Sequence, residues 1–238
     1  MEEGLLSPRE ELKEVLDQLK NLLNADDEMG LSPPTLSLEA ARYLEDNKEQ
    51  INSLESLRAF IGECERCKLW QGRTKLVFGE GSPDARLVFV GEGPGREEDL
   101  EGRPFVGEAG RLLTKIIQAM GLSREEVYIC NVVKCRPPRN RDPERDEIET
   151  CIPFLKQQIS LIRPDVICAL GRIAASELTG KESRITAIRG RWSAFMGIPL
   201  MPTYHPAYLL RKPAAKREVW DDAKKIMKHL GLEVKKND

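Results

Sequence analysis

Four short apolar runs, separated by longer stretches with helical spacing, constrain the fold of this chain more than any other feature. The runs span residues 87–90, 127–133, 166–170 and 200–204. Because nearly every position in them is apolar, they indicate strands buried on both faces, as in parallel sheets. The stretches predicted to be helical are residues 108–120, 145–161, 171–178 and 215–229. We therefore expect an α/β fold with three layers, αβα, around a central, mainly parallel, four-stranded sheet.

The first 55 residues differ in charge from the rest of the chain. They contain 14 Asp and Glu against 5 Lys and Arg, a balance of −9, which leaves +7 for residues 56–238 because the whole chain carries −2. We predict an acidic, partly helical N-terminal extension, with helices at 8–23 and 38–47, and one globular domain over 56–238. A further helix at 53–63 leads to the first cysteine pair. A mildly basic domain is compatible with a polyanionic partner.

The chain has the composition of an intracellular protein. No stretch approaches the ~18 to 20 apolar residues that a membrane helix needs, and the first residues are acidic, unlike a signal peptide. We expect a prokaryotic cytoplasmic protein that is monomeric and does not associate with membranes. In a reducing compartment, six cysteines in 238 residues suggest metal binding rather than a disulfide framework.

Two of the six cysteines, Cys130 and Cys168, lie inside apolar runs, where a cysteine usually behaves as a small buried hydrophobe. The four others are Cys64, Cys67, Cys135 and Cys151. Four thiolates suit either tetrahedral zinc or an iron–sulfur cluster, and their spacing does not choose between the two. A CxxC redox pair is the alternative, but no βαβ unit surrounds these residues.

The residues that follow the four apolar runs are unusual. In parallel sheets ligands bind outside the carboxyl ends of the strands, so the loops after these runs should form one site. The first loop contains the turn of residues 91–95, GEGPG, whose glycines allow close approach to a flat ligand. The others begin with Asn131, with Gly171 and with His205. Topology alone therefore predicts a binding site here.

Each candidate side chain in this site also has a structural interpretation. His205 could be a core histidine, and Asn131 a turn or cap residue, but an amide has the donor and acceptor that reading a base edge requires. Phe105 could belong to the core, or its ring could stack on a base. Glu92 and Glu98 could be solvated charges, or carboxylates that orient water or stabilise positive charge on a sugar.

The motifs, taken together, resemble the family 4 uracil-DNA glycosylases, the thermostable iron–sulfur type within the uracil-DNA glycosylase superfamily. The resemblance covers about residues 56–230. It depends on four ordered motifs: CERCKLW, VGEGPGREEDLEGRPFVGEAGRLL, NVVKCRPPRNRDP followed by Cys151, and HPAYLLR.

The resemblance implies a monofunctional glycosylase that flips uracil out of single- or double-stranded DNA and hydrolyses its N-glycosidic bond, in base excision repair. It implies a 4Fe–4S cluster on Cys64, Cys67, Cys135 and Cys151. In the implied pocket Phe105 stacks on uracil, Asn131 reads its polar edge, and His205 hydrogen-bonds the uracil O2. Glu92 and Glu98 match acidic positions of the family. Leu209 or Leu210 would fill the vacated space in DNA, with Arg211 near phosphate.

The sequence departs from the best-known branch of the superfamily at two pocket positions. That branch has Asp where Gly93 stands and Tyr where Gly95 stands, whereas family 4 has small residues at both. The implied mechanism therefore depends on stabilising the leaving group. Two other hypotheses are a uracil-DNA binder with little turnover, which the absence of histidine in RPPRNRDP disfavours, and a zinc-stabilised DNA-binding module.

Overall fold

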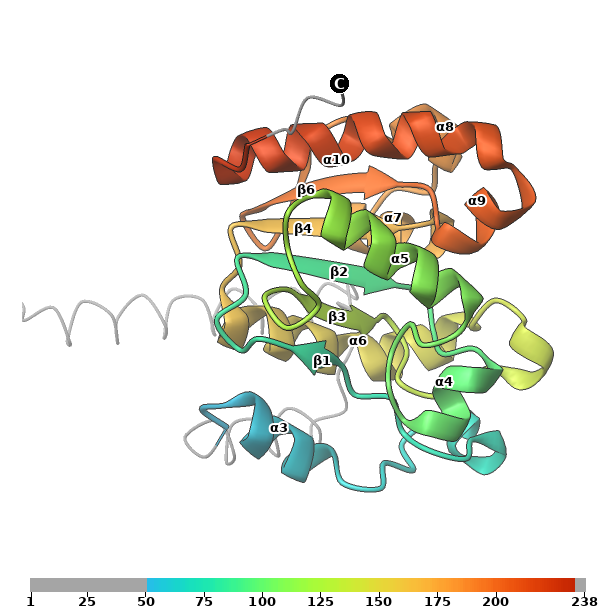
Figure 1. Cartoon of the computed structure of the whole chain (residues 1–238). Coiled ribbons are helices and arrows are strands. Elements are labelled where there is room, and N and C mark those ends of the chain that lie inside the picture. Colours follow the sequence, from blue (N-terminus) through green and yellow to red (C-terminus); the bar gives the residue numbers. More distant parts are fainter. Residues whose placement is uncertain (1–50, 234–238) are drawn as a thin grey trace, which may run out of the picture. The chain divides into compact units, whose positions relative to one another are not determined.

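The computed structural model describes residues 51–233, which form three layers around one sheet (Figure 1). The strands are β1 (Glu80–Gly81), β2 (Leu87–Gly91), β3 (Tyr128–Asn131), β4 (Val166–Leu170), β5 (Ser193–Phe195) and β6 (Ile198–Thr203). The α-helices are α3 (Leu54–Ile61), α4 (Arg96–Glu101), α5 (Glu108–Ala119), α6 (Arg145–Ile162), α7 (Arg172–Thr179), α8 (Ile185–Ile188), α9 (Pro206–Arg211) and α10 (Lys216–Leu230). Three short 3-10 helices, η1 (Lys68–Gly72), η2 (Pro138–Asn140) and η3 (Pro213–Ala215), lie between them.

The sheet has the strand order β1-β3-β2-β4-β6-β5. The four inner strands are parallel and confirm the predicted α/β sheet, whereas β1 and β5 are antiparallel additions at its two edges. The prediction of four strands was wrong in number, because edge strands of two and three residues are too short to produce an apolar pattern. The inner register aligns Gly91 with Asn131, so the loops that follow β2 and β3 begin side by side.

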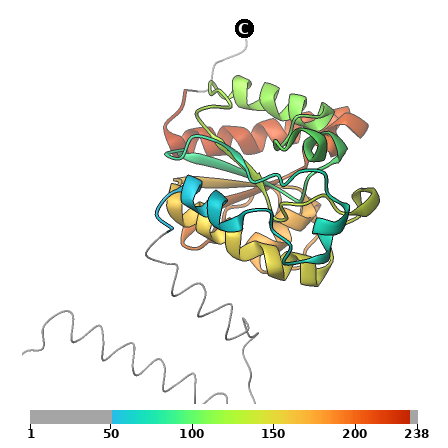
Figure 2. The same cartoon turned by 90° about the horizontal axis from the view of Figure 1, so that it is seen from below.

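Helices cover both faces of the sheet. In Figures 1 and 2, α5 and α10 lie on one face and α3, α6 and α7 on the other. The side chains of β2 alternate between the two cores: Val88 and Val90 pack on the α6 side, and Leu87 and Phe89 on the α5 side. Each of these fully buried side chains contributes roughly 1.5–3 kcal/mol by leaving water. Burial on both faces explains why β2 is apolar throughout.

Helix α3 belongs to the globular body. Ser53 caps it, since its hydroxyl accepts a hydrogen bond from Ser56 N at 3.1 Å. Leu54, Leu57 and Ile61 are buried in the core on the α6 side of the sheet. The compact unit begins at Ile51, a few residues before the predicted boundary at 56. The helices predicted at 8–23 and 38–47 lie outside the described residues.

The longest helix of the described residues, α6, spans 18 residues. Within 51–233, no helix combines the length and the apolar character that crossing a membrane requires.

Candidate functional site

The carboxyl ends of the inner strands gather the predicted site residues. A Cβ atom added to Gly91, the last residue of β2, would lie 2.4 Å from Asn131 Oδ1 and 2.6 Å from Phe105 Cζ. A Cβ on Gly171, directly after β4, would lie 3.0 Å from the Cβ of His205. A side chain at either position would collide with a neighbouring candidate residue, so both positions require glycine. The structure brings Asn131, Phe105 and His205 to one edge of the sheet, as their places in the sequence predict.

The ring of Phe105 faces that of His205, with centroids 5.5 Å apart and planes at 32°. Phe105 has a positive φ of 52°, which a bulky residue adopts only when its surroundings impose it. Arg124 donates hydrogen bonds to Phe105 O at 3.1 Å and to Pro104 O at 2.9 Å. A Cβ on Gly110 would lie 1.9 Å from Phe105 O. The loop thus holds the ring in a fixed position beside the histidine.

His205 is a neutral imidazole with a defined donor. It is the N-cap of α9, and its Nδ1 accepts a hydrogen bond from Ala207 N at 3.1 Å. The ring proton therefore lies on Nε2, which is free to donate. Burial lowers the pKa of His205 to about 4, and the charge of Arg211 acts in the same direction, against that of Glu98. At neutral pH the site holds an uncharged hydrogen-bond donor.

Asn131 provides an unused hydrogen-bonding group at the bottom of the site. The residue is 1% exposed, and its Oδ1 has no hydrogen-bond partner among the described residues. Leaving a buried polar atom unpaired costs roughly 1–3 kcal/mol. An amide kept in this state beside an aromatic ring and an imidazole donor is suited to a planar ligand with polar edges.

The two candidate glutamates lie in different environments. Glu98 Oε1 accepts hydrogen bonds from Val106 N and Gly107 N, both at 3.0 Å, and its Oε2 accepts one from Gly95 N at 3.1 Å. Both oxygens are thus engaged in joining the glycine turn after β2 to the loop that contains Phe105. This arrangement assigns Glu98 to holding that loop.

Glu92 has a carboxylate without a hydrogen-bond partner in the described part of the chain. It is half-buried, and burial raises its pKa to about 7, to which the nearby charge of Asp142 adds. Arg172 acts in the opposite direction. Asp142 and Arg172 form an ion pair that joins the loops after β3 and β4, on either side of the strand that leads to Glu92. Of the two glutamates, Glu92 is the one free to act on a ligand.

Gly93 and Gly95 are packed closely against neighbouring side chains. A Cβ on Gly93 would lie 2.7 Å from Val133 Cγ2, and one on Gly95 would lie 2.7 Å from Glu98 Oε2. Gly93 thus allows the glycine turn to lie against the loop that follows β3, and Gly95 leaves room for the Glu98 carboxylate of α4.

The two leucines of the motif HPAYLLR point in different directions. Leu209 is 1% exposed and packs with Tyr204, Ala215 and Val219, whereas Leu210 is 36% exposed. Of these two leucines, only Leu210 has a side chain exposed to solvent. Arg211 follows it at the exposed end of α9.

The four predicted metal-binding cysteines meet in one place. Cys64, Cys67, Cys135 and Cys151 line a single small cavity, and none of them forms a disulfide. Cys130 and Cys168 are buried in the two cores, as predicted.

Two donors point at sulfur atoms of this cysteine cavity. Arg73 Nη1 lies 3.3 Å from Cys135 Sγ, and Lys134 N lies 3.3 Å from Cys151 Sγ. Burial raises the pKa of the Cys151 thiol to about 12, and binding of a metal group to a cysteine requires the thiolate form. The donor set therefore fits a thiolate-bound metal group.

Three residues that sequence reasoning did not single out also support the site: Arg124, Asp142 and Lys134. Arg124 and Asp142 give no signal in the sequence, because their partners are distant along the chain. Lys134 has one, since a lysine interrupts the apolar sequence NVVKC and yet is 1% exposed.

A mainly parallel sheet whose carboxyl edge brings together Asn131, Phe105 and His205 defines an α/β protein with a candidate ligand site at that edge. The family model of the Uracil DNA glycosylase superfamily matches residues 78–224, a range that includes the sheet and every candidate residue of this edge, and the chain belongs to that superfamily.

Relatives within the superfamily narrow the assignment to one branch. The Type-4 uracil-DNA glycosylase of Sulfurisphaera tokodaii is 48% identical over 185 residues, 74% of this chain and 84% of that protein. The Type-4 enzyme of Thermotoga maritima is 49% identical over 182 residues, 75% of this chain and 94% of that protein. A Type-5 uracil-DNA glycosylase of Pyrobaculum aerophilum is 29% identical over 173 residues, 66% of this chain and 76% of that protein. The similarity is thus greater to the Type-4 enzymes than to this Type-5 enzyme.

Proposed function

We propose that the protein removes uracil from DNA by hydrolysing the N-glycosidic bond, leaving an abasic site for base excision repair. The observation that carries this function is the neutral His205, whose ring lies beside that of Phe105, at the sheet edge where the Oδ1 of Asn131 is buried and unpaired. A flipped uracil fits this arrangement, because it is flat and has two carbonyl oxygens and an N–H group. Phe105 would stack on its face, and the Asn131 amide would bind its polar edge.

His205 stabilises the leaving group in this mechanism. As the bond between the sugar C1′ and the uracil N1 breaks, its electron pair moves into the base, and negative charge develops on O2. A neutral imidazole stabilises this charge by donating a hydrogen bond from Nε2, and no proton has to be transferred first. Its position is already fixed by the Nδ1 bond to Ala207, so little reorganisation accompanies the reaction.

Glu92 is our candidate for the group that acts on the sugar and water. The departing base leaves positive charge on the sugar, which an ionised carboxylate stabilises. Water attacks C1′, and its proton passes to the Glu92 carboxylate. Glu98 keeps the Phe105 loop in place through its three backbone hydrogen bonds and takes no part in proton transfer.

The cysteine cavity is proposed to hold a 4Fe–4S cluster. In residues 51–233, no three His, Cys, Asp or Glu side chains lie close enough together to hold one metal ion, although four cysteines line one cavity. Four thiolates around one cavity are the ligand set of an iron–sulfur cluster. When bound, the cluster supplies a cross-link between the segment before β1, the loop after β3 and helix α6.

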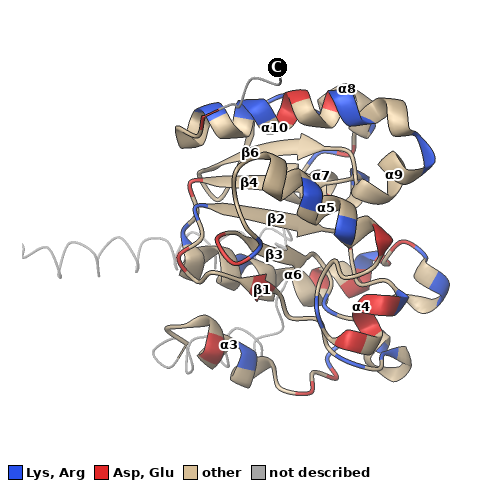
Figure 3. Ribbon diagram, viewed as in Figure 1, with Lys and Arg blue, Asp and Glu red and all other residues tan. Residues whose placement is uncertain are grey.

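The DNA is proposed to lie over the carboxyl edge of the sheet, with Leu210 entering the space that uridine vacates and Arg211 near a phosphate. Figure 3 shows basic residues at the end of α9, whereas α4 is acidic. An enzyme with this substrate acts in the compartment that holds the genome, which we propose is a prokaryotic cytoplasm. We also propose that the protein acts as a monomer, because one chain contains the complete site.

The proposed function is tested on a labelled oligonucleotide with a single uracil, incubated with the purified protein, treated with alkali and separated on a gel. We expect cleavage at uracil and none at thymine in the control strand. An uncut strand that still shifts with bound protein would support a uracil-DNA binder without turnover. No cut and no shift would contradict both functions.

A further inference from the structure

Lys134 is a buried lysine that lies between the cysteine cavity and the end of β3. The residue is 1% exposed, and its Nζ donates hydrogen bonds to Asn131 O at 2.8 Å and to Gln158 Oε1 at 2.5 Å. Burying an amine costs free energy unless its N–H donors are paired, so the lysine can be buried here only because these two acceptors pair with it.

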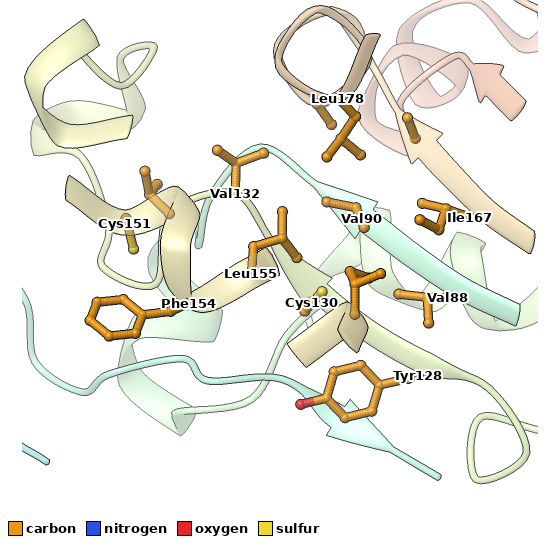
Figure 4. Close-up of a cluster of buried hydrophobic side chains, with 14 of the residues drawn as sticks. Val88, Val90, Tyr128, Cys130, Val132, Cys151, Phe154, Leu155, Ile167 and Leu178 are labelled. Atoms are coloured by element: carbon orange, nitrogen blue, oxygen red, sulfur yellow. The ribbon is translucent and has the colours of Figure 1, made fainter. Parts of the chain in front are cut away.

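Gln158, on helix α6, is itself held by two further bonds. Its Nε2 donates to Phe78 O at 2.9 Å and to the hydroxyl of Tyr128 at 3.1 Å. Figure 4 shows the hydrophobic cluster between the sheet and α6, in which Cys130 of β3 lies beside Leu155 of α6. The acceptor that Gln158 presents to Lys134 therefore has a fixed orientation.

The same lysine also contacts the cysteine cavity. Its backbone N–H donates to Cys151 Sγ at 3.3 Å, the residue is among those that line that cavity, and the next residue is Cys135. Its carbonyl accepts a hydrogen bond from Val77 N at 2.9 Å, which fixes the backbone at this point. One residue thus touches the proposed cluster site at its backbone and the proposed uracil-reading strand at its side-chain end.

We propose that Lys134 is a positioning residue that couples the cysteine cavity to the base-reading Asn131. Its Nζ donates to the carbonyl of Asn131 and thereby holds the end of β3 at a fixed distance from the loop that contributes Cys135. The inference depends on the proposed function, because it gives Asn131 the role of contacting uracil. It implies that a well-ordered cysteine cavity stabilises the uracil pocket, and that a well-ordered uracil pocket stabilises the cavity.

The first test is a double-mutant cycle on the full chain with its cluster. Lys134→Met keeps the aliphatic volume and removes the donors. We expect it to lower the single-turnover rate on uracil DNA about 10-fold or more, and to add less than about 3-fold when Asn131 is already Ala. Lys156→Met, on the exposed face of α6, is the matched control and should match the wild type in both backgrounds. Equal losses in both backgrounds would overturn the proposal.

A second readout is independent of turnover. Iron release to a chelator is followed by visible absorbance, with and without an oligonucleotide containing non-hydrolysable 2′-fluoro-deoxyuridine. We expect the bound DNA to slow iron release several-fold in the wild type and in Lys156→Met, and to have no effect in Lys134→Met. Equal protection in Lys134→Met, or none in the wild type, would contradict the coupling.

If Lys134→Met does not fold, Gln158→Met takes its place in the cycle, because it removes one acceptor of the lysine and leaves the lysine itself. The same non-additivity with Asn131→Ala is expected, and additive losses would overturn the proposal. A wild-type protein that cuts uracil DNA while the cycle is additive refutes this inference alone. A wild type that does not cut refutes the proposed function first.

Discussion

The Nδ1 atom of His205 accepts a hydrogen bond from the backbone N–H of Ala207 at 3.1 Å, and this contact determines which ring nitrogen can donate to a ligand. The contact exists because His205 is the N-cap of α9, where an unpaired backbone donor needs an acceptor. A local feature of helix capping thus sets the chemistry of the site.

His205→Ala should lower the rate of uracil excision by ~100- to 1000-fold, as the loss of one donor to a developing anion does elsewhere. Affinity for uracil DNA, measured by fluorescence anisotropy, should change little. His229→Ala, which removes the other histidine, is the control and should remain active. Normal turnover in His205→Ala would contradict the assigned role.

The excision rate should depend on the ionisation of Glu92. Because burial raises its pKa to about 7, the carboxylate form is the minor one below that pH and the main one above it. Single-turnover rates should therefore rise about 10-fold per pH unit below 7 and level off above it. Glu92→Gln should be slower and lose this dependence. An unchanged profile in the variant would assign the titration to another group.

Glu98→Gln should act through structure rather than through proton transfer. A Gln side chain has one acceptor oxygen, so it can keep the hydrogen bonds from Val106 and Gly107 only by turning its amide N–H toward Gly95 N, and one bond is lost. The link between the glycine turn and the Phe105 loop therefore loosens. Hydrogen bonds to a charged group contribute about 1.5–3 kcal/mol each, and a loss of this order should appear in denaturant unfolding. The rate should fall while its pH dependence matches that of the wild type. Glu97→Gln, one position away and exposed, is the control.

The two neighbouring leucines should give opposite phenotypes. Leu209→Ala creates a cavity in the core and should cost about 2–5 kcal/mol of unfolding free energy. Leu210→Ala should leave stability unchanged and reduce excision from double-stranded DNA more than from single strands, where no vacated space has to be filled. Equal activity of Leu210→Ala on both substrates would argue against a wedge.

Metal content should separate the two groups of cysteines. The purified protein should be brown and contain about four iron atoms per chain if the cavity holds the proposed 4Fe–4S cluster. Cys135→Ser should lose the iron, whereas Cys168→Ala, buried in the opposite core, should retain it. Finding one zinc per chain, with no visible absorbance, would identify the cavity as a zinc site.

Much of the fold and of the site could be predicted from residue order because the signals are local. A strand buried on both faces must be apolar along its length, so β2, β3, β4 and β6 are visible as runs. Since parallel strands end at one edge, the residues that follow them meet there, and Asn131 and His205 could be placed together without coordinates. The same apolar runs separate Cys130 and Cys168, which lie inside them, from the four cysteines that lie outside.

The tertiary structure decided the roles within pairs of similar residues. Glu92 and Glu98 are alike in sequence, but the Glu98 carboxylate accepts hydrogen bonds from Val106 and Gly107, while the Glu92 carboxylate has no hydrogen-bond partner within 51–233. Leu209 and Leu210 differ only in which side of α9 they occupy. The coupling residue Lys134 depends on a partner 24 positions away in α6. The physical reason is the same in each case: apolar periodicity is a property of neighbouring residues, whereas hydrogen-bond partners and burial are contributed by segments that folding alone brings together.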